Sequence, residues 1–346
     1  MSVSIRNHNI DLIKFVAMLA VIAAHTCYPG KYQLSGCSTL IYDASSPAIL
    51  LFIMASGYLL LGRQDASYRY SLAKCMKIIR IVVIWTIILT LPTTITAELT
   101  GWHVNLKIVI SQCFIDCTLG LLGLNRFYFW YFGAMIFIFL LYPLLNKVYN
   151  NPRQFKILMS GLLILQTIIF TVQFILVLTD ITTYPLEYYI PQSLRIWNWV
   201  FYFCLGGLFK KPDLIRLPAR LFSFLGLSIC MIIAIGSLWM TQDFFHCPNF
   251  EFYYSSIFII LYTTSTFGYL LKVNIIYPKI IDNAAQLFLP VYLLQYWVIG
   301  LIENTVPIQS FGKLAPPVVW LMAVILTVTL SYILMKIPLV KKITHF

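Results

Sequence analysis

Residues 11–25 read Asp11-Leu-Ile-Lys14-Phe-Val-Ala-Met-Leu-Ala-Val-Ile-Ala-Ala-His25, an apolar segment with ionisable side chains near both ends. In an α-helix, the eleven residues from Lys14 to His25 turn through about 1100°, which is three turns plus about 20°. Lys14 and His25 would therefore share one face, about 16 Å apart along the axis, or roughly half the apolar thickness of a bilayer. Asp11 precedes Lys14 by three residues, a spacing that allows an ion pair on that face.

Ionisable side chains inside a membrane helix are energetically costly and usually face a cavity or a partner with which they function. Asp11, Lys14 and His25 are therefore candidate catalytic residues. A simpler interpretation is that Lys14 extends to the membrane surface and that His25 forms a hydrogen bond with a neighbouring helix. The residues alone leave both interpretations open.

The composition is that of a membrane protein rather than of a soluble domain. The chain has 346 residues, 60% of them hydrophobic and only 10% charged, and its mean hydropathy is +0.84. The net charge of +12 could indicate nucleic-acid binding, but the basic residues fall in the loops between apolar stretches, where they determine topology. The eight cysteines form no set with the spacing of zinc ligands, so we expect no metal and no bound cofactor.

The apolar stretches predict an all-α, polytopic membrane protein with about ten transmembrane helices, in a single domain over residues 1–346. The predicted spans are 10–28, 46–62, 79–97, 127–145, 157–179, 194–209, 221–240, 255–271, 287–302 and 318–337. Nineteen of the 24 Lys and Arg residues fall on one side of this arrangement, which places both termini in the cytoplasm. Counting residues 98–126 as a span would reverse that distribution. We therefore expect an outer re-entrant or interfacial segment there.

The outer loops of this topology differ in character from the cytoplasmic ones. They carry eight of the twelve acidic residues and are rich in Tyr, Trp and Phe. Aromatic faces beside carboxylates are suited to hold a sugar, by stacking and by hydrogen bonds to hydroxyl groups. For any single residue, however, the aromatic belt of a membrane protein is the simpler explanation.

Five stretches follow one another in an order that is typical of one family. They are Asp11-Leu-Ile-Lys14 with His25 after ten further residues, Phe52-Ile-Met-Ala-Ser56-Gly57-Tyr58, Lys77-Ile-Ile-Arg80, Arg126-Phe-Tyr-Phe-Trp130-Tyr131 with Tyr142-Pro143, and Phe203-Cys-Leu-Gly206-Gly207. Together they resemble the acyltransferase-3 family of bacterial integral-membrane acyltransferases, whose best-known members O-acetylate lipopolysaccharide O-antigen and related surface glycans. Each stretch alone is a weak signal, but the resemblance covers nearly the whole chain.

The resemblance implies an inner-membrane O-acetyltransferase that moves an acetyl group from cytoplasmic acetyl-CoA to a hydroxyl of a lipid-linked or surface saccharide. His25 would act as general base or as a nucleophile that carries the acetyl group, and Lys14, oriented by Asp11, would hold or polarise the donor. The cations assigned to donor binding are Lys74, Lys77 and Arg80. The residues assigned to the acceptor or its channel are Ser56, Gly57, Tyr58, Arg126, Trp130, Tyr131 and Gln295.

One position departs from the family pattern. Many members carry a histidine after the segment that here reads Val291-Tyr-Leu-Leu, whereas this chain has Gln295. A glutamine cannot transfer a proton as a histidine does, so Gln295 could only orient a substrate. Members with a fused esterase-like domain are much longer, so we expect a stand-alone transferase.

Two alternatives stay open at this stage. The enzyme could transfer another acyl group, such as succinyl, or use a periplasmic glycan as acceptor. The chain could instead be a transporter or flippase for a lipid-linked sugar. A transporter is expected to show inverted repeats and interrupted helices in corresponding halves, which the sequence does not display.

Overall fold

The computed structural model describes residues 7–29, 36–99, 107, 111, 127–211 and 222–344. Within these residues the chain forms α-helices and short 3-10 helices and no β-strand, so the predicted all-α fold is confirmed. Arg126 and most of the segment 98–126 lie outside the described residues, and the predicted re-entrant segment stays a prediction.

The helices follow the predicted spans closely. Their bounds are α1 His8–Thr26, α2 Gly36–Ala44, α3 Ala48–Leu60, α4 Tyr68–Leu99, α6 Trp130–Tyr149, α7 Pro152–Leu178, α8 Ile196–Leu208, α9 Phe224–Phe245, α10 Ile257–Leu270, α11 Pro278–Gln286, α12 Phe288–Thr305, α13 Ala315–Leu334 and α14 Pro338–Thr344. Short 3-10 helices include η2 Leu186–Tyr189, η3 Gln192–Leu194 and η5 Phe250–Phe252. Each of the ten predicted spans overlaps one of these helices.

Six helical segments in the described part of the chain are long and apolar enough to cross a membrane, and α8 and α10 are shorter apolar helices. The pair α11 and α12 would make a seventh span that bends by 61° at its break. The chain is therefore a multi-pass membrane protein. The count of ten spans stays a prediction.

α1 and α7 begin where the sequence supplies a side-chain cap. The Asn7 side chain accepts hydrogen bonds from the backbone N–H groups of Asn9 (3.1 Å) and Ile10 (3.3 Å) at the start of α1. Asn151 caps α7 in the same way through the N–H of Gln154, and Pro152 follows in the first turn. Both ends match the residue preferences of helix N-termini.

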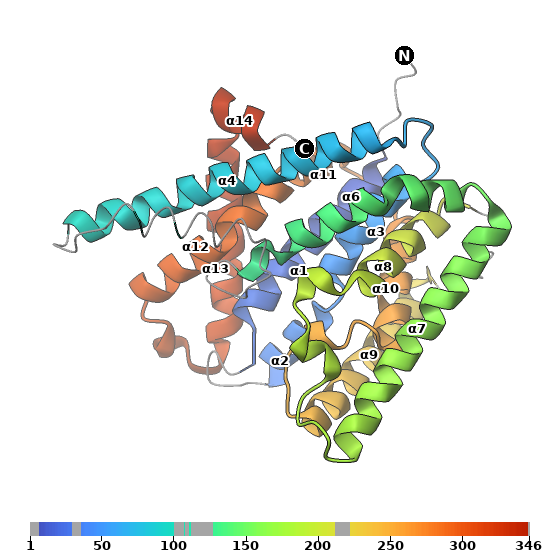
Figure 1. The fold of residues 1–346 in the computed structure, drawn as a ribbon. Coiled ribbons are helices and arrows are strands. Elements are labelled where there is room, and N and C mark those ends of the chain that lie inside the picture. The colour runs from blue at the N-terminus through green and yellow to red at the C-terminus, as the bar shows by residue number, and fades with distance from the viewer. Residues whose placement is uncertain are drawn as a thin grey trace.

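α3 lies at the centre of the bundle and packs most closely on α8. A Cβ atom on Gly57 would collide with the carbonyl oxygen of Phe203, and one on Gly206 would collide with that of Met54. The two helices therefore approach backbone to backbone, as small residues allow between membrane helices. In Figure 1, α4 crosses above α6, and α7 lines the lower right flank. Most of the apolar side chains of α7 are exposed, as expected for a lipid-facing helix.

One end of the bundle gathers the beginning of α1 with the ends of α3, α8 and α10. The Asn9 side-chain amide donates to the carbonyl of Leu270 at 2.9 Å, and the Lys210 ammonium donates to the carbonyl of Leu61 at 2.8 Å. At the other end, the Tyr28 hydroxyl donates to Asn249 at 2.7 Å. These contacts agree with the alternation predicted from the basic residues. The end that faces the cytoplasm stays a prediction.

The sequence allows a disulfide between either of two pairs of cysteines in the predicted outer regions, Cys27 with Cys37 or Cys113 with Cys117. In the structure Cys27 is buried, Cys37 is exposed, and both are free thiols. Cys113 and Cys117, the other pair, lie outside the described residues.

Candidate active site

α1 presents the ion pair that its sequence predicts. The Lys14 ammonium lies 3.5 Å from a carboxylate oxygen of Asp11, one turn earlier. Asp11 is 7% exposed, and a carboxylate in the first turn also interacts favourably with the helix dipole. α1 is a continuous helix from His8 to Thr26, so Lys14 and His25 share a face, about 16 Å apart along its axis.

His25, at the opposite end of α1, packs against an aromatic side chain of α12. Its ring meets that of Tyr296 edge to face, with centroids 5.7 Å apart and planes at 85°. Tyr128 also packs on Tyr296, with the two rings stacked, their centroids 5.4 Å apart and their planes at 22°. Aromatic contacts of this kind contribute about 0.5–1.5 kcal/mol each beyond the area they bury, so they hold the rings in place.

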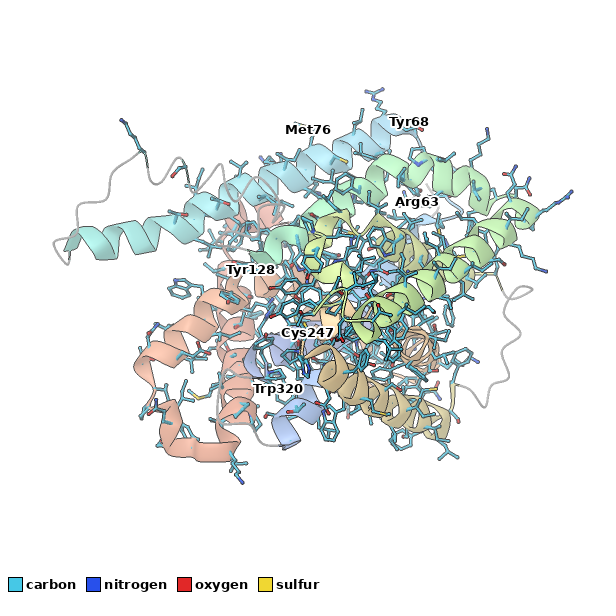
Figure 2. The ribbon with its side chains drawn as sticks, turned by 60° about the horizontal axis from the view of Figure 1, so that its bottom comes forward. Arg63, Tyr68, Met76, Tyr128, Cys247 and Trp320 are labelled. Carbon is cyan, nitrogen blue, oxygen red and sulfur yellow. The ribbon has the colours of Figure 1, made fainter. Side chains whose placement is uncertain are left out.

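The aromatic group extends from Tyr296 into the bundle. The Tyr292 hydroxyl donates to the backbone carbonyl of Tyr128. The Tyr131 ring lies 5.5 Å from that of Tyr292 and 6.5 Å from that of Phe52 on α3. Figure 2 shows Tyr128 among the side chains of the interior. The structure thus brings the predicted residue Tyr131 into the same packed group as His25.

Trp130, another residue assigned to the acceptor, lies at the start of α6. Its ring stacks on Trp199 of α8 at 4.9 Å, and the Trp199 indole N–H donates to the carbonyl of Gln192 at 2.8 Å. Trp130 is therefore packed against the loop that precedes α8 and meets Tyr131 edge to face at 6.4 Å.

Gln295 precedes Tyr296 on α12 and is 1% exposed. Neither its amide nitrogen nor its carbonyl oxygen has a hydrogen-bond partner in the described part of the chain. An unpaired buried amide costs about 1–3 kcal/mol. Since Gln295 follows Phe288 by seven residues, the two share a face of α12, and Phe288 packs on Phe52 at 4.1 Å. The carboxamide therefore lies on a face of α12 that packs inward.

Ser56, Gly57 and Tyr58 lie toward the Lys14 end of α1. The Tyr58 hydroxyl is 3.4 Å from the side-chain nitrogen of Asn7, which caps α1. The Ser56 hydroxyl donates to the carbonyl of Phe52, one turn earlier in its own helix, at 3.0 Å. Gly57 is required by the close approach of α8, and that packing accounts for it without a substrate.

The three cations assigned to the donor lie in the first turns of α4. Burial lowers the pKa of Lys77, and the neighbouring charge of Arg80 lowers it further. Lys74 lies with its ammonium 5.7 Å from the ring centroid of Tyr70. All three belong to one helix, so their proximity follows from their sequence spacing.

Sequence reasoning did not identify Tyr296 and Tyr128. Tyr128 lies within the motif that begins at Arg126 and Tyr296 follows Gln295, but the chain has 22 tyrosines, and nothing in the local pattern marks these two as neighbours of His25. Arg126, two residues before Tyr128, lies outside the described residues. Within the described residues, no group of three or more His, Cys, Asp or Glu side chains could hold a metal ion.

At one end of α1, the His25 imidazole therefore packs against the rings of Tyr296 and its neighbours. The other end carries the ion pair of Asp11 and Lys14. A family model described as an acyltransferase domain matches residues 7–336. No curated protein and no solved structure matches the chain. Because the family match covers nearly the whole chain, this protein belongs to the acyltransferase-3 family of membrane acyltransferases.

Proposed function

We propose that the protein transfers an acetyl group from cytoplasmic acetyl-CoA to a sugar hydroxyl of O-antigen or a related bacterial surface glycan, at the inner membrane. The observation that carries the proposal is the single face of α1 that bears Lys14 and His25 about 16 Å apart. A donor on one side of the membrane and an acceptor on the other require polar groups at both depths, and α1 supplies them.

In the reaction, His25 accepts the proton of the sugar hydroxyl while the hydroxyl oxygen attacks the carbonyl carbon of the thioester. A carbon–oxygen bond forms, the carbon–sulfur bond breaks, and the proton passes to the departing CoA thiolate. In the other form of the mechanism, a His25 ring nitrogen attacks the thioester carbonyl, the carbon–sulfur bond breaks and the CoA thiolate leaves. The sugar oxygen then attacks the acetyl carbon, the nitrogen–carbon bond breaks, and the hydroxyl proton passes to the freed ring nitrogen.

Lys14 acts on the donor away from the reacting carbonyl. The separation of about 16 Å along α1 is too long for Lys14 and His25 to contact the same carbonyl group. If His25 acts at the reacting carbonyl, Lys14 therefore cannot also polarise that carbonyl. We assign to Lys14 a charge contact with the donor, with Asp11 holding its ammonium in place.

Tyr296, which is 40% exposed, supplies aromatic surface beside His25, and the buried rings of Tyr128, Tyr131 and Trp130 pack behind it toward the loop before α8. Such surface suits the apolar faces of a sugar ring. Gln295 supplies a carboxamide that can both donate and accept hydrogen bonds, which suits a hydroxyl or a carbonyl group. The arrangement does not discriminate acetyl from succinyl.

A second function, transport of a lipid-linked sugar, is favoured by one observation. The helix pair α11 and α12 is bent by 61° at Leu287, and interrupted helices are typical of transporter binding sites. The sequence did not reveal this bend. Among the described residues it is the one bent pair found, so it lacks the counterpart in the other half that an inverted repeat requires.

The test compares surface glycans, by mass spectrometry, from cells that carry the gene, lack it, or carry His25→Ala. Acetyl transfer predicts a glycan mass increase of one acetyl group that depends on both the gene and His25. A glycan that is absent from the surface without the gene, but unmodified with it, would support transport instead.

A further inference from the structure

The turn between α3 and α4 holds Arg63 in a fixed position. Gly62 has φ +82°, a conformation that glycine adopts readily, and its N–H donates to the side-chain oxygen of Asn146 at 2.7 Å. The amide nitrogen of Asn146 in turn donates to the carbonyl of Arg63 at 2.9 Å. One asparagine of α6 therefore clamps both peptide groups of the turn.

The Arg63 side chain is also fixed. Its Nε and Nη2 atoms donate to the two carboxylate oxygens of Asp65 at 2.8 and 2.6 Å, and its guanidinium carbon lies 5.5 Å from the ring centroid of Tyr70. Because the Lys74 ammonium lies 5.7 Å from the same ring, Tyr70 brings Arg63 and Lys74 together. In Figure 2, Arg63 lies near the beginning of α4, where Tyr68 and Met76 point outward.

Lys210, from the end of α8, joins this group because it donates to the carbonyl of Leu61 at 2.8 Å. Burial lowers the pKa of Lys210, and the charge of Arg63 lowers it further. Burial also lowers the pKa of Lys74, with further contributions from the charges of Lys77 and Arg63. Tyr70 joins Arg63 to Lys74, the spacing of three residues carries the set along α4, and Lys210 reaches the backbone two residues before Arg63. The five cations thus form a continuous set, which we call the basic row: Lys210, Arg63, Lys74, Lys77 and Arg80.

The basic row is assembled from three separate segments of the chain, which bring together cations that repel one another. Its five cations and the carboxylate of Asp65 give a formal charge of +4. An anion with several phosphate oxygens would relieve the repulsion, since guanidinium and ammonium groups are the usual phosphate ligands of proteins. One phosphomonoester together with one diphosphate diester carries about −4 at neutral pH, which matches the row.

We propose that the basic row binds the phosphorylated nucleotide end of the acyl donor, which carries a 3′-phosphate and a 5′-diphosphate, with Arg63 and Lys210 as ligands beside the cations of α4. The inference rests on the proposed function, which supplies acetyl-CoA as donor, and it adds two ligands from outside α4. An anionic lipid headgroup shares the same phosphate chemistry, and the experiment separates the two sources.

The probe is adenosine 3′,5′-bisphosphate, titrated against the full-length protein in nanodiscs of neutral phosphatidylcholine. We expect it to bind more tightly than adenosine 5′-monophosphate and to weaken as salt is raised. Arg63→Gln and Lys210→Gln should each weaken binding about tenfold, the scale of a lost hydrogen bond to a charged group. Lys156→Gln, which removes an exposed cation of α7 outside the row, is the matched control and should leave affinity unchanged.

Asp65→Asn provides a variant that acts in the opposite direction. It removes the carboxylate and raises the formal charge of the row to +5. Both side chains of the Arg63–Asp65 pair are exposed, and an exposed ion pair contributes little stability, so its loss should cost the fold little. We expect tighter binding of the bisphosphate by severalfold. Weaker binding in Asp65→Asn, or equal affinity for the monophosphate and the bisphosphate, would overturn the proposal.

A second arm uses nanodiscs that contain phosphatidylglycerol. If that lipid co-purifies with the wild type but not with Arg63→Gln, and the bisphosphate does not bind, the row belongs to lipid and the proposal is wrong. Bisphosphate binding needs no acyl transfer. If the protein binds the bisphosphate through the row but does not acetylate a glycan, only the proposed function is rejected. If it acetylates a glycan but Arg63→Gln and Lys210→Gln leave the donor affinity unchanged, only the assignment of the basic row is rejected.

Discussion

The imidazole of His25 and the phenol ring of Tyr296 meet edge to face at 5.7 Å, across the contact between α1 and α12. The Tyr296 ring also stacks on the ring of Tyr128, so the ring that contacts the imidazole is itself held in place by packing. Tyr296 is also 40% exposed, and His25 itself is partly exposed. A histidine that is packed on one side without being buried suits proton transfer to an incoming hydroxyl.

The first prediction concerns His25 itself. His25→Ala should lower acyl transfer by about 10²–10⁴-fold while the protein accumulates normally in the membrane. Loss of a merely structural hydrogen bond between membrane helices averages only about 0.6 kcal/mol, so the two roles differ widely in effect. The measurement is glycan acetylation at matched protein abundance. His246→Asn, at the end of α9, is the control; a His25→Ala protein with more than about a tenth of normal activity would end the catalytic assignment.

The second prediction separates the charge of Lys14 from its shape. Lys14→Ala should abolish transfer, whereas Lys14→Arg should keep partial activity because the cation beside Asp11 is retained. If Lys14 contacts the donor, Lys14→Arg should raise the KM for acetyl-CoA more than it lowers kcat. Full activity of Lys14→Ala would return this residue to a simple role at the membrane surface.

The third prediction tests Tyr296 as a positioning residue. Tyr296→Phe keeps the ring that meets His25 and should retain most activity, whereas Tyr296→Ala removes it and should lower kcat about tenfold or more. Because the ring would act through His25, Tyr296→Ala should also change the pH–rate profile. Equal loss in both variants would instead point to the hydroxyl group.

The fourth prediction concerns pH and stability. Glu187 is fully buried, and burial raises its pKa above the ordinary 4.5 in spite of hydrogen bonds from Trp197 (3.2 Å) and Asn198 (2.7 Å). The folded state therefore retains this proton to higher pH than the unfolded state does. The resulting stabilisation is complete below pH 4.5 and is lost as pH rises through the folded-state pKa.

In detergent, the Tm of the wild type should therefore contain a component that falls as pH rises from about 4.5, and Glu187→Gln should lack it. Thermal unfolding followed across this pH range measures the difference. An identical pH dependence of Tm in the two proteins would contradict the assignment.

The fifth prediction concerns topology. With both termini in the cytoplasm, single cysteines placed at Lys107 and Tyr189 should react with an impermeant thiol reagent from the periplasm, and one at Lys156 only after the membrane is opened. Tyr189 is 58% exposed, whereas Glu187 in the same loop is fully buried and would not react from either side. Labelling of position 107 only from the cytoplasm would contradict the ten-span arrangement.

The sequence by itself determined what depends on composition and on spacing within one helix. Long apolar stretches between basic loops predicted the helices, and the distance from Lys14 to His25 follows from helical geometry once α1 is a helix. The ion pair of Asp11 with Lys14 is local in the same sense, and the family resemblance needed only the order of short motifs.

Only the tertiary structure decided which side chains meet across helices. Tyr296 lies 271 residues after His25 in the chain, and its contact depends on how α12 packs against α1. Lys210 reaches Leu61 because Gly57 and Gly206 let α3 and α8 approach so closely. The break between α11 and α12 lies where a polar segment meets an apolar one, so the sequence indicates the boundary, but only the structure shows the bend of 61°. Apolar side chains pack against many partners with similar energy, so local pattern does not specify the partner; the shape of the whole bundle does.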